Sequence, residues 1–222
     1  MRPPRGTAAT CAKRHFLSPL ALLLMTPGFA NRTDAAHQLA AHLQHLRQSP
    51  RGVVLVVPRG GVPMGAIVAK ALDWPLDVVL TKKIGHLAHP EYAVGAVSLE
   101  SVVLTPGVVL PDGYLDEQVA RIRQRLQQRH QAYVGNRLPL VLTGRTVVLV
   151  DDGVATGHTL LATVELVRQQ APARVVVAVP VSSPQALGRL QAVADEVVCL
   201  LVPPNFQAVG QFYQDFTQVI DE

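Results

Sequence analysis

The sequence predicts an α/β fold, a three-layer sandwich in which helices cover both faces of a central, mostly parallel β-sheet. Two observations carry this prediction. Short, valine-rich apolar runs alternate along the chain with segments of helical periodicity, as they do in βαβ units. The 222 residues are 49% hydrophobic and 16% charged, a balance that suits one globular domain with at most a small appendage.

Residues 1–30 differ from the rest, and we expect them to be a disordered N-terminal extension to a domain that spans residues 31–222. They contain no acidic residue and hold the basic residues Arg2, Arg5, Lys13 and Arg14. A basic start before an apolar run is also typical of an export signal, but the run at residues 20–25 is short and has a proline near each end. We therefore favour the extension over the export signal and expect a cytoplasmic protein.

The charge of the chain argues against nucleic acid as a partner. The net charge of +4 comes from the extension, because the remaining residues hold 16 basic and 16 acidic side chains. A helix expected at residues 114–133 is rich in arginine, and a solvated helix face explains this more simply than a nucleic-acid or acidic partner does. No apolar run approaches the ~20 residues of a membrane span, so we expect no membrane partner.

The first half of the domain is expected to contain two helices and two strands in the order helix, strand, helix, strand. Capping residues, apolar faces with helical spacing and β-branched runs mark these elements. They are a helix from Thr33 or Asp34 to about residue 48, a strand at 52–57, a helix at 62–72 and a strand at 76–81.

The middle of the chain lacks the βαβ pattern and predicts an insertion over the active face at about residues 97–135. Residues 82–96 are rich in glycine, histidine and proline, which is typical of a loop. A β-hairpin that turns at Thr105-Pro106-Gly107 is expected at residues 97–109. The long basic helix follows it.

The last part of the chain returns to alternating strands and helices. We expect strands at 146–150, 174–179 and 196–201, a helix after the first of them and another at 184–193. A short helix near residues 209–216 closes the chain in a small C-terminal hood. The aromatic residues of this hood either stack a nucleobase or pack on the core, and the sequence favours neither. They are Phe206, Phe212, Tyr213 and Phe216.

Residues 147–159, Val-Val-Leu-Val-Asp-Asp-Gly-Val-Ala-Thr-Gly-His-Thr, are the most informative stretch. A buried strand ends in two adjacent carboxylates, Asp151 and Asp152, and a loop with two glycines leads into an amphipathic helix. The N–H groups of such a turn bind anions, and ligands of open α/β sheets bind at the carboxyl ends of strands. The carboxylates repel a phosphate but suit hydroxyl groups or a divalent cation. A ribose phosphate suits both parts of this stretch, its phosphate the N–H groups of the turn and its hydroxyls the two carboxylates.

This stretch resembles the signature of the type I phosphoribosyltransferases, which have a Rossmann-like fold and bind phosphoribosyl pyrophosphate (PRPP). The resemblance implies that the acidic pair contacts the ribose hydroxyls and that the following turn wraps the 5′-phosphate. The residues carried over to this site are Asp151, Asp152, Gly153, Val154, Ala155, Thr156, Gly157, His158 and Thr159. A generic βα turn with an acidic pair, as in metal-binding receiver-like domains, is the alternative.

Two further strand ends extend the resemblance. Arg59-Gly60-Gly61 forms a glycine turn between a strand and a helix, where backbone amides approach phosphate and arginine adds a forked donor. Lys82 and Lys83 are expected at the end of the next strand. In the family, elements of these types hold pyrophosphate, so the resemblance implies the same role for Arg59, Gly60, Gly61, Lys82 and Lys83. A solvated lysine pair is the alternative for the last two.

The loop at residues 85–95 is expected to close as a lid over the reacting centre. Its His89-Pro90-Glu91-Tyr92 pattern and Ala208-Val209-Gly210 near the end resemble a bacterial subgroup of predicted phosphoribosyltransferases whose acceptor is not settled. The family's 6-oxopurine enzymes carry an acid at the position of Ala155, and Gly153 replaces a branched residue, which is expected to loosen the turn. We assign the general base to Glu91, with a structural role as the alternative. The expected catalytic residues are Asp151, Asp152, Lys83 and Glu91.

Together these patterns predict a Mg²⁺-dependent phosphoribosyltransferase that moves the 5-phosphoribosyl group from PRPP to a nitrogenous acceptor, expected to be a nucleobase, and releases pyrophosphate. Mg²⁺ is expected to be held mainly through the ligand, with Asp151 and Asp152 as its candidate protein ligands. The expected partners are PRPP and a small-molecule acceptor, and the resemblance implies a homodimer. A PRPP- or nucleotide-binding regulator without catalysis and a phosphohydrolase are the alternatives.

Overall fold

The computed structural model describes residues 28–49, 51–88, 93–108 and 110–219, and it confirms the predicted α/β sandwich. Five parallel strands form the central sheet in the order β2-β1-β6-β7-β8. The strands are β1 (Gly52–Val56), β2 (Leu76–Val78), β6 (Thr146–Val150), β7 (Arg174–Val181) and β8 (Glu196–Leu201). Because β1 and β6 are neighbours that pair in register from Gly52↔Thr146 to Val56↔Val150, their carboxyl ends meet at one edge.

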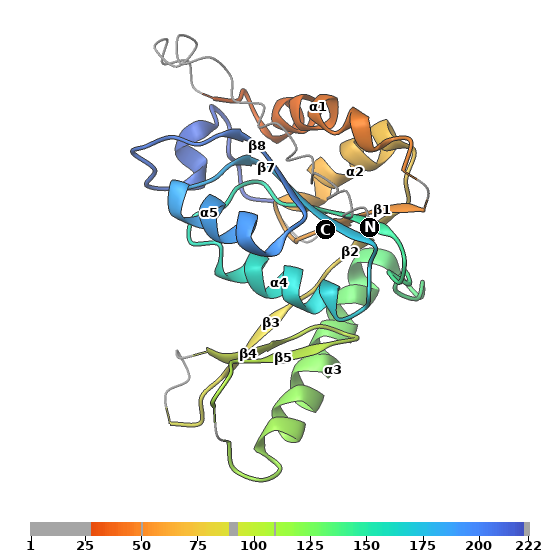
Figure 1. Cartoon of the computed structure of the whole chain (residues 1–222), viewed down its shortest axis with the longest axis vertical. Helices are drawn as coiled ribbons and strands as arrows, with labels where there is room; N and C mark the ends of the chain where they lie inside the picture. The colour runs from red at the N-terminus through yellow and green to blue at the C-terminus, as the bar shows by residue number, and fades with distance from the viewer. Residues whose placement is uncertain (1–27, 50, 89–92, 109, 220–222) are drawn as a thin grey trace, which may run out of the picture.

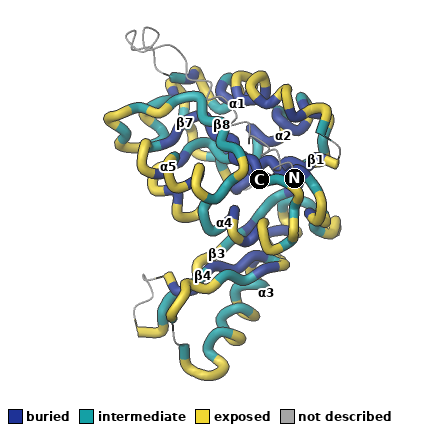
Figure 2. Tube along the Cα trace, in the orientation of Figure 1, coloured by how far each residue is buried: buried dark blue, intermediate teal, exposed yellow. Residues whose placement is uncertain are grey.

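Helices cover both faces of this sheet (Figure 1). On one face lie α1 (Arg32–His42) and α2 (Gly61–Leu72), and on the other lie α4 (His158–Arg168) and α5 (Pro184–Val193). Alternate residues of each strand face opposite layers: in β1, Val54 packs with the first pair of helices and Val53 with the second. Every residue of β1 is buried (Figure 2). Every residue of β6 is buried as well, as expected of strands covered on both sides.

A second, smaller sheet lies below the sandwich in Figure 1. It is antiparallel, in the order β3 (Lys82–Gly85), β4 (Ala93–Val97) and β5 (Val102–Leu104). The long helix α3 (Tyr114–Val134) packs against it over a small core that includes Ile84, Val94 and Val97. This unit is the predicted insertion, which begins at residue 82 rather than at residue 97.

Three predictions for this part of the chain were wrong. The expected loop at residues 82–96 contains β3 and β4, and the hairpin turns at Ser98–Ser101, where Ser98 Oγ accepts from the Ser101 N–H at 3.0 Å, rather than at Thr105-Pro106-Gly107. The strand expected at 76–81 ends at Val78. Lysine, glycine and alanine have low β propensity, so it is pairing with neighbouring strands, and not local composition, that makes these segments extended.

The ends of the domain also differ from expectation. Phe29 is 3% exposed and its N–H donates to the Phe212 carbonyl at 2.9 Å, so packing starts before residue 31. The cap of α1 is Asn31, whose side chain accepts from the Asp34 N–H, and the helix ends at His42 before a 3₁₀ turn, η2 (Gln44–Leu46). Residues 1–27 of the expected extension lie outside the described residues.

The hood contains one 3₁₀ turn, η3 (Val209–Phe212), in place of the helix expected at residues 209–216. The Gln211 side chain accepts from the N–H groups of Gln207 and Ala208 at 3.1 Å and so closes the turn locally. None of the helices in the described part of the chain is both long and apolar enough to cross a membrane.

Candidate functional site

Two loops meet at the carboxyl ends of β1 and β6. Strand pairing continues one residue beyond β1, where the Val57 N–H donates at 3.0 Å to the carbonyl of Val150, the last residue of β6. A Cβ on Gly60 would lie 1.8 Å from Asp152 Oδ2, and one on Gly61 would lie 2.7 Å from the Val150 carbonyl oxygen. A side chain at Gly61 would meet backbone, and one at Gly60 would displace the Asp152 carboxylate. The structure brings the glycine turn after β1 directly against the acidic pair after β6.

The two carboxyl groups of the acidic pair are not equivalent. The Asp152 N–H donates to Asp151 Oδ1 at 2.8 Å. Burial, and then the nearby charge of Asp152, raises the pKa of Asp151 to about 8, because both disfavour its ionised form. At neutral pH Asp151 is therefore mostly protonated. The pair offers one hydroxyl donor and one ionised acceptor, a combination that suits ribose hydroxyls.

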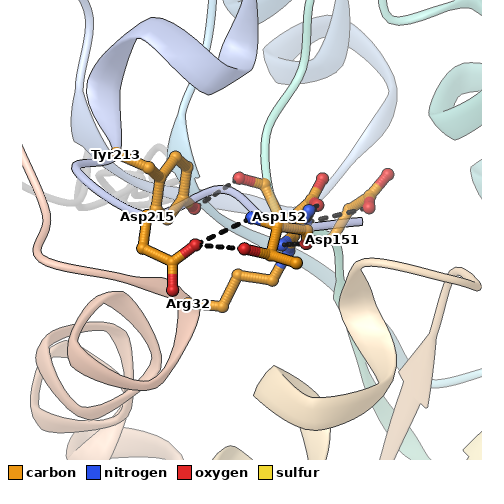
Figure 3. Close-up of polar contacts among 6 residues, drawn as sticks. Arg32, Asp151, Asp152, Tyr213 and Asp215 are labelled. Carbon is orange, nitrogen blue, oxygen red and sulfur yellow. Dashed lines mark hydrogen bonds and ion pairs between the residues drawn. The ribbon is translucent and has the colours of Figure 1, made fainter. Parts of the chain in front are cut away.

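Arg32, in the first turn of α1, reaches the same carboxylate (Figure 3). Its Nε and Nη2 atoms lie 2.9 and 2.8 Å from Asp152 Oδ2. Nη1 donates to the Thr217 carbonyl at 2.7 Å, and the guanidinium carbon lies 3.8 Å from the centre of the Phe216 ring. Sequence reasoning missed Arg32 because 120 residues separate it from Asp152 and no motif links them. Arg32 could have been predicted only from the sheet order, which places α1 over β7 and β8.

Tyr213 joins the hood to the acidic loop. Its Oη donates to the Asp152 carbonyl at 2.6 Å, as Figure 3 shows. Burial raises the pKa of Tyr213 above its usual range, so the phenol stays a donor. Its ring lies 5.3 Å from that of Phe29 and 4.9 Å from that of Phe216, and the other two aromatic residues of the hood also pack on this core. The structure therefore favours packing over base stacking as their role.

The turn carried over to the 5′-phosphate leads into α4. Gly157 caps the helix with φ = +79°, a conformation that favours glycine. Thr156, His158 and Thr159 around it are exposed, and the first N–H groups of a helix have no partner within it. The turn thus presents donors to an anion at the surface.

Gly153 makes room for the hood. A Cβ at this position would lie 2.5 Å from Val209 Cγ1 and 2.9 Å from Val181 Cγ1. The space that a branched side chain occupies elsewhere is therefore filled by η3. The Val154 N–H donates to the Val181 carbonyl at 2.9 Å, which fixes the next residue as well.

Ala155 offers no group that could take a proton. It is exposed, and its carbonyl accepts from Ser183 Oγ, the cap of α5, at 2.6 Å. Beside it, His158 Nε2 lies 3.3 Å from Arg189 Nη1. His158 therefore supplies a polar side chain in this loop, whereas Ala155 supplies none.

The residues assigned to pyrophosphate come from two different sheets. Arg59 is exposed at the tip of the glycine turn, after a cis peptide bond between Pro58 and Arg59. Lys82 and Lys83 are exposed at the start of β3, and so they belong to the insertion rather than to the end of a central strand as expected. Glu91, His89 and Tyr92 of the expected lid lie outside the described residues.

The protein alone does not provide a complete metal site in the part of the chain that the structure describes. No group of three or more His, Cys, Asp or Glu side chains there is placed to hold a metal ion. Asp151 is mostly protonated at neutral pH and Asp152 is paired with Arg32. The acidic pair therefore fits a divalent cation that a ligand brings, and does not fit one held by protein groups alone.

Known proteins resemble nearly the whole described chain. A family model described as a phosphoribosyl transferase domain matches residues 30–217. Two curated proteins of Mycobacterium tuberculosis, from strains CDC 1551 and H37Rv, both named "Putative phosphoribosyl transferase", are 41% identical over 199 residues, which is 87% of this chain and 45% of each relative. The chain thus spans about half the length of these relatives. The crystal structure of TT1426 from Thermus thermophilus is 46% identical, covers 87% of this chain and 93% of its own, and superposes with a TM-score of 0.78.

Proposed function

This chain belongs to the phosphoribosyl transferase family, and we propose that it transfers the 5-phosphoribosyl group from PRPP to a nitrogenous acceptor, a nucleobase in nucleotide salvage, and releases pyrophosphate. The observation that carries the proposal is the contact between its two loops, in which Gly60 leaves room for the Asp152 carboxylate. In this proposal, a turn of the kind that binds phosphate and a pair of carboxyls suited to ribose bind the same ligand.

In this proposal the donor is held at three points. The turn from Thr156 to Thr159 anchors the 5′-phosphate, a remote contact that orients the reacting carbon. The hydroxyls of the ribose bond to Asp151 as protonated carboxyl and to Asp152 as carboxylate, which is the protonation that the pKa of Asp151 supports. Arg59 and the backbone of the glycine turn bind the pyrophosphate.

The leaving group is stabilised by cations and backbone donors. The bond between C1′ and the pyrophosphate oxygen breaks while C1′ gains cationic character, and negative charge moves onto pyrophosphate. Arg59 and the exposed pair Lys82 and Lys83 are our assignment for the groups that meet this charge. Mg²⁺ fits the site as a partner of the PRPP phosphates, and when bound it would neutralise part of the same charge.

The acceptor nitrogen forms the new bond to C1′ and loses a proton. The Ala155 methyl cannot take that proton. We keep Glu91 as the proposed general base, on the pattern around it in the sequence. The homodimer and the cytoplasmic location are likewise proposals that rest on resemblance to the family, and sizing chromatography and cell fractionation test them.

The test is incubation of the purified chain with PRPP, Mg²⁺ and a panel of nucleobases, with release of pyrophosphate as the measured product. Release that depends on a base supports the transferase. Release without a base supports the phosphohydrolase, and binding of PRPP without any turnover supports the regulator.

Removal of both carboxylates should abolish turnover. Asp151→Asn with Asp152→Asn leaves the shape of the loop but takes away the ionised acceptor for the ribose, so we expect kcat/KM to fall at least about 1,000-fold, roughly 4 kcal/mol of transition-state stabilisation. The matched control is Asp112→Asn with Asp116→Asn, two exposed carboxylates near the start of α3. An unchanged rate in the first double variant would sink the assignment of the ribose site.

A further inference from the structure

The ion pair between Arg32 and Asp152 uses only one of the two carboxylate oxygens. Nε and Nη2 both contact Oδ2. The backbone N–H and carbonyl of Asp152 are also engaged, by Asp151 Oδ1 and Tyr213 Oη. Among the residues that the structure describes, no hydrogen bond or ion pair reaches Asp152 Oδ1. An ionised oxygen with open acceptor capacity is therefore left at the site.

The other end of Arg32 holds the C-terminal segment, residues 214–217. Nη1 bonds to the Thr217 carbonyl and the guanidinium lies over Phe216. The backbone of the segment is also tied to the residues just before α1, because the N–H groups of Gln214 and Asp215 donate to the carbonyls of Phe29 and Ala30 at 2.9 and 3.0 Å. A single guanidinium thus links the acidic loop, α1 and the C-terminal segment.

The environment of this ion pair keeps its geometry fixed. The side chains of Arg32 and Asp152 are only 13% and 16% exposed, so water screens the pair little. Lysine could not replace this arrangement, because the planar guanidinium supplies donors in three directions and a face for the Phe216 ring, whereas an ammonium is a point charge.

We propose that Arg32 is a positioning residue of the ribose site: it fixes Asp152 through Oδ2, leaves Oδ1 to accept from a ribose hydroxyl, and holds the C-terminal segment beside the same carboxylate. This inference rests on the proposed function, since it takes Asp152 to bind the ribose of PRPP. Arg32 itself does not touch the ribose, and its effect on binding passes through Asp152.

The experiment compares Arg32→Gln and Arg32→Lys with Arg47→Gln, a change at an exposed arginine just beyond α1. Calorimetry with PRPP and Mg²⁺, at a temperature well below the Tm of each variant, measures the Kd. We expect R32Q to weaken PRPP binding at least about tenfold and R32K to recover only part of it, since charge without geometry is not enough. R47Q should bind as the wild type does.

A double-mutant cycle separates positioning from a merely structural role. If Arg32 acts through Asp152, R32Q should weaken PRPP binding less than about twofold in an Asp152→Asn background. Amide exchange adds a readout without ligand: residues 214–217 should exchange faster in R32Q than in R47Q.

Three results would overturn the inference: an unchanged Kd in R32Q, effects that add in the double variant, or full recovery of binding by R32K. Unchanged amide exchange would overturn its C-terminal part. A wild-type chain that binds no PRPP refutes the proposed function itself, and this outcome differs from all of the others.

Discussion

The carboxyl edge of the parallel sheet and the antiparallel insertion contribute to the proposed site in different ways. At the edge, buried strands end in loops that touch over Gly60 and are held by the shielded ion pair of Arg32 and Asp152. In the insertion, Lys82 and Lys83 are the exposed first residues of a strand in a small separate sheet. The edge supplies fixed geometry and the insertion supplies charge. A substitution that changes the shape of a side chain should therefore impair the edge, and one that removes a charge should impair the insertion.

The largest effect is expected where shape is tightest. Gly60→Ala places a methyl group 1.8 Å from Asp152 Oδ2, which must push the carboxylate or the glycine turn aside. We expect kcat/KM to fall about 100-fold, since small displacements at a reacting centre are costly. Steady-state kinetics with PRPP measures this.

The control for that change is Gly188→Ala in α5, where a Cβ would meet nothing within 4 Å. Alanine is the better helix former by about 1 kcal/mol, so this variant should keep full activity and gain stability. Equal losses in the two variants would show that the contact at Gly60 has no special role.

A smaller effect is expected from charge in the insertion. Lys82→Ala with Lys83→Ala should lower kcat about 30-fold, because the leaving pyrophosphate loses two cations. The free energy of unfolding should change by less than about 1 kcal/mol, since both side chains are exposed. Lys70→Ala, exposed in the last turn of α2, is the control. If the double variant unfolds easily instead, the insertion is structural and the contrast with the sheet edge fails.

The buried Asp151 should also give the edge a pH-dependent stability. The pKa of Asp151 is about 8 in the folded chain against an ordinary 3.8, so between these values the folded state binds more protons than the unfolded state. The free energy of unfolding must then fall as the pH rises across this range. In urea titrations with EDTA we expect the wild type to lose about 2–3 kcal/mol more than Asp151→Asn between about pH 5 and 7. Parallel pH curves would contradict the raised pKa.

The smallest effect concerns the hydroxyl groups of two tyrosines. Tyr213 bonds to the acidic loop at the edge, and Tyr114 bonds within the insertion. Tyr213 Oη donates to the Asp152 carbonyl at 2.6 Å, and Tyr114 Oη donates to the Gly85 carbonyl at 2.8 Å. Tyr213→Phe and Tyr114→Phe should each cost about 1 kcal/mol of stability. Only Tyr213→Phe should weaken PRPP binding, by about threefold, and equal effects on Kd would erase the distinction between the regions.

The sequence predicted the sheet edge well because its signals are local. A valine-rich strand, an acidic pair and a glycine turn are contiguous in residues 147–159, and parallel strands must end at one edge. Insertion and hood depend on partners far along the chain. β3 exists because Lys82 pairs with Val97, and Arg32 matters because the fold carries α1 to Asp152. Neither relation leaves a pattern in neighbouring residues.

The register of β1 with β6 fixes the distance between the two loops of the site. The bond from the Val57 N–H to the Val150 carbonyl continues that register. Two loops that grow from adjacent, fully buried strands cannot slide past one another, so the span between the turn after β6 and the turn after β1 is constant. In the proposed function, a ligand is then selected by its length as well as by its chemistry. In that proposal, ribose 5-phosphate contacts only the turn after β6, whereas PRPP contacts the turns after β6 and β1.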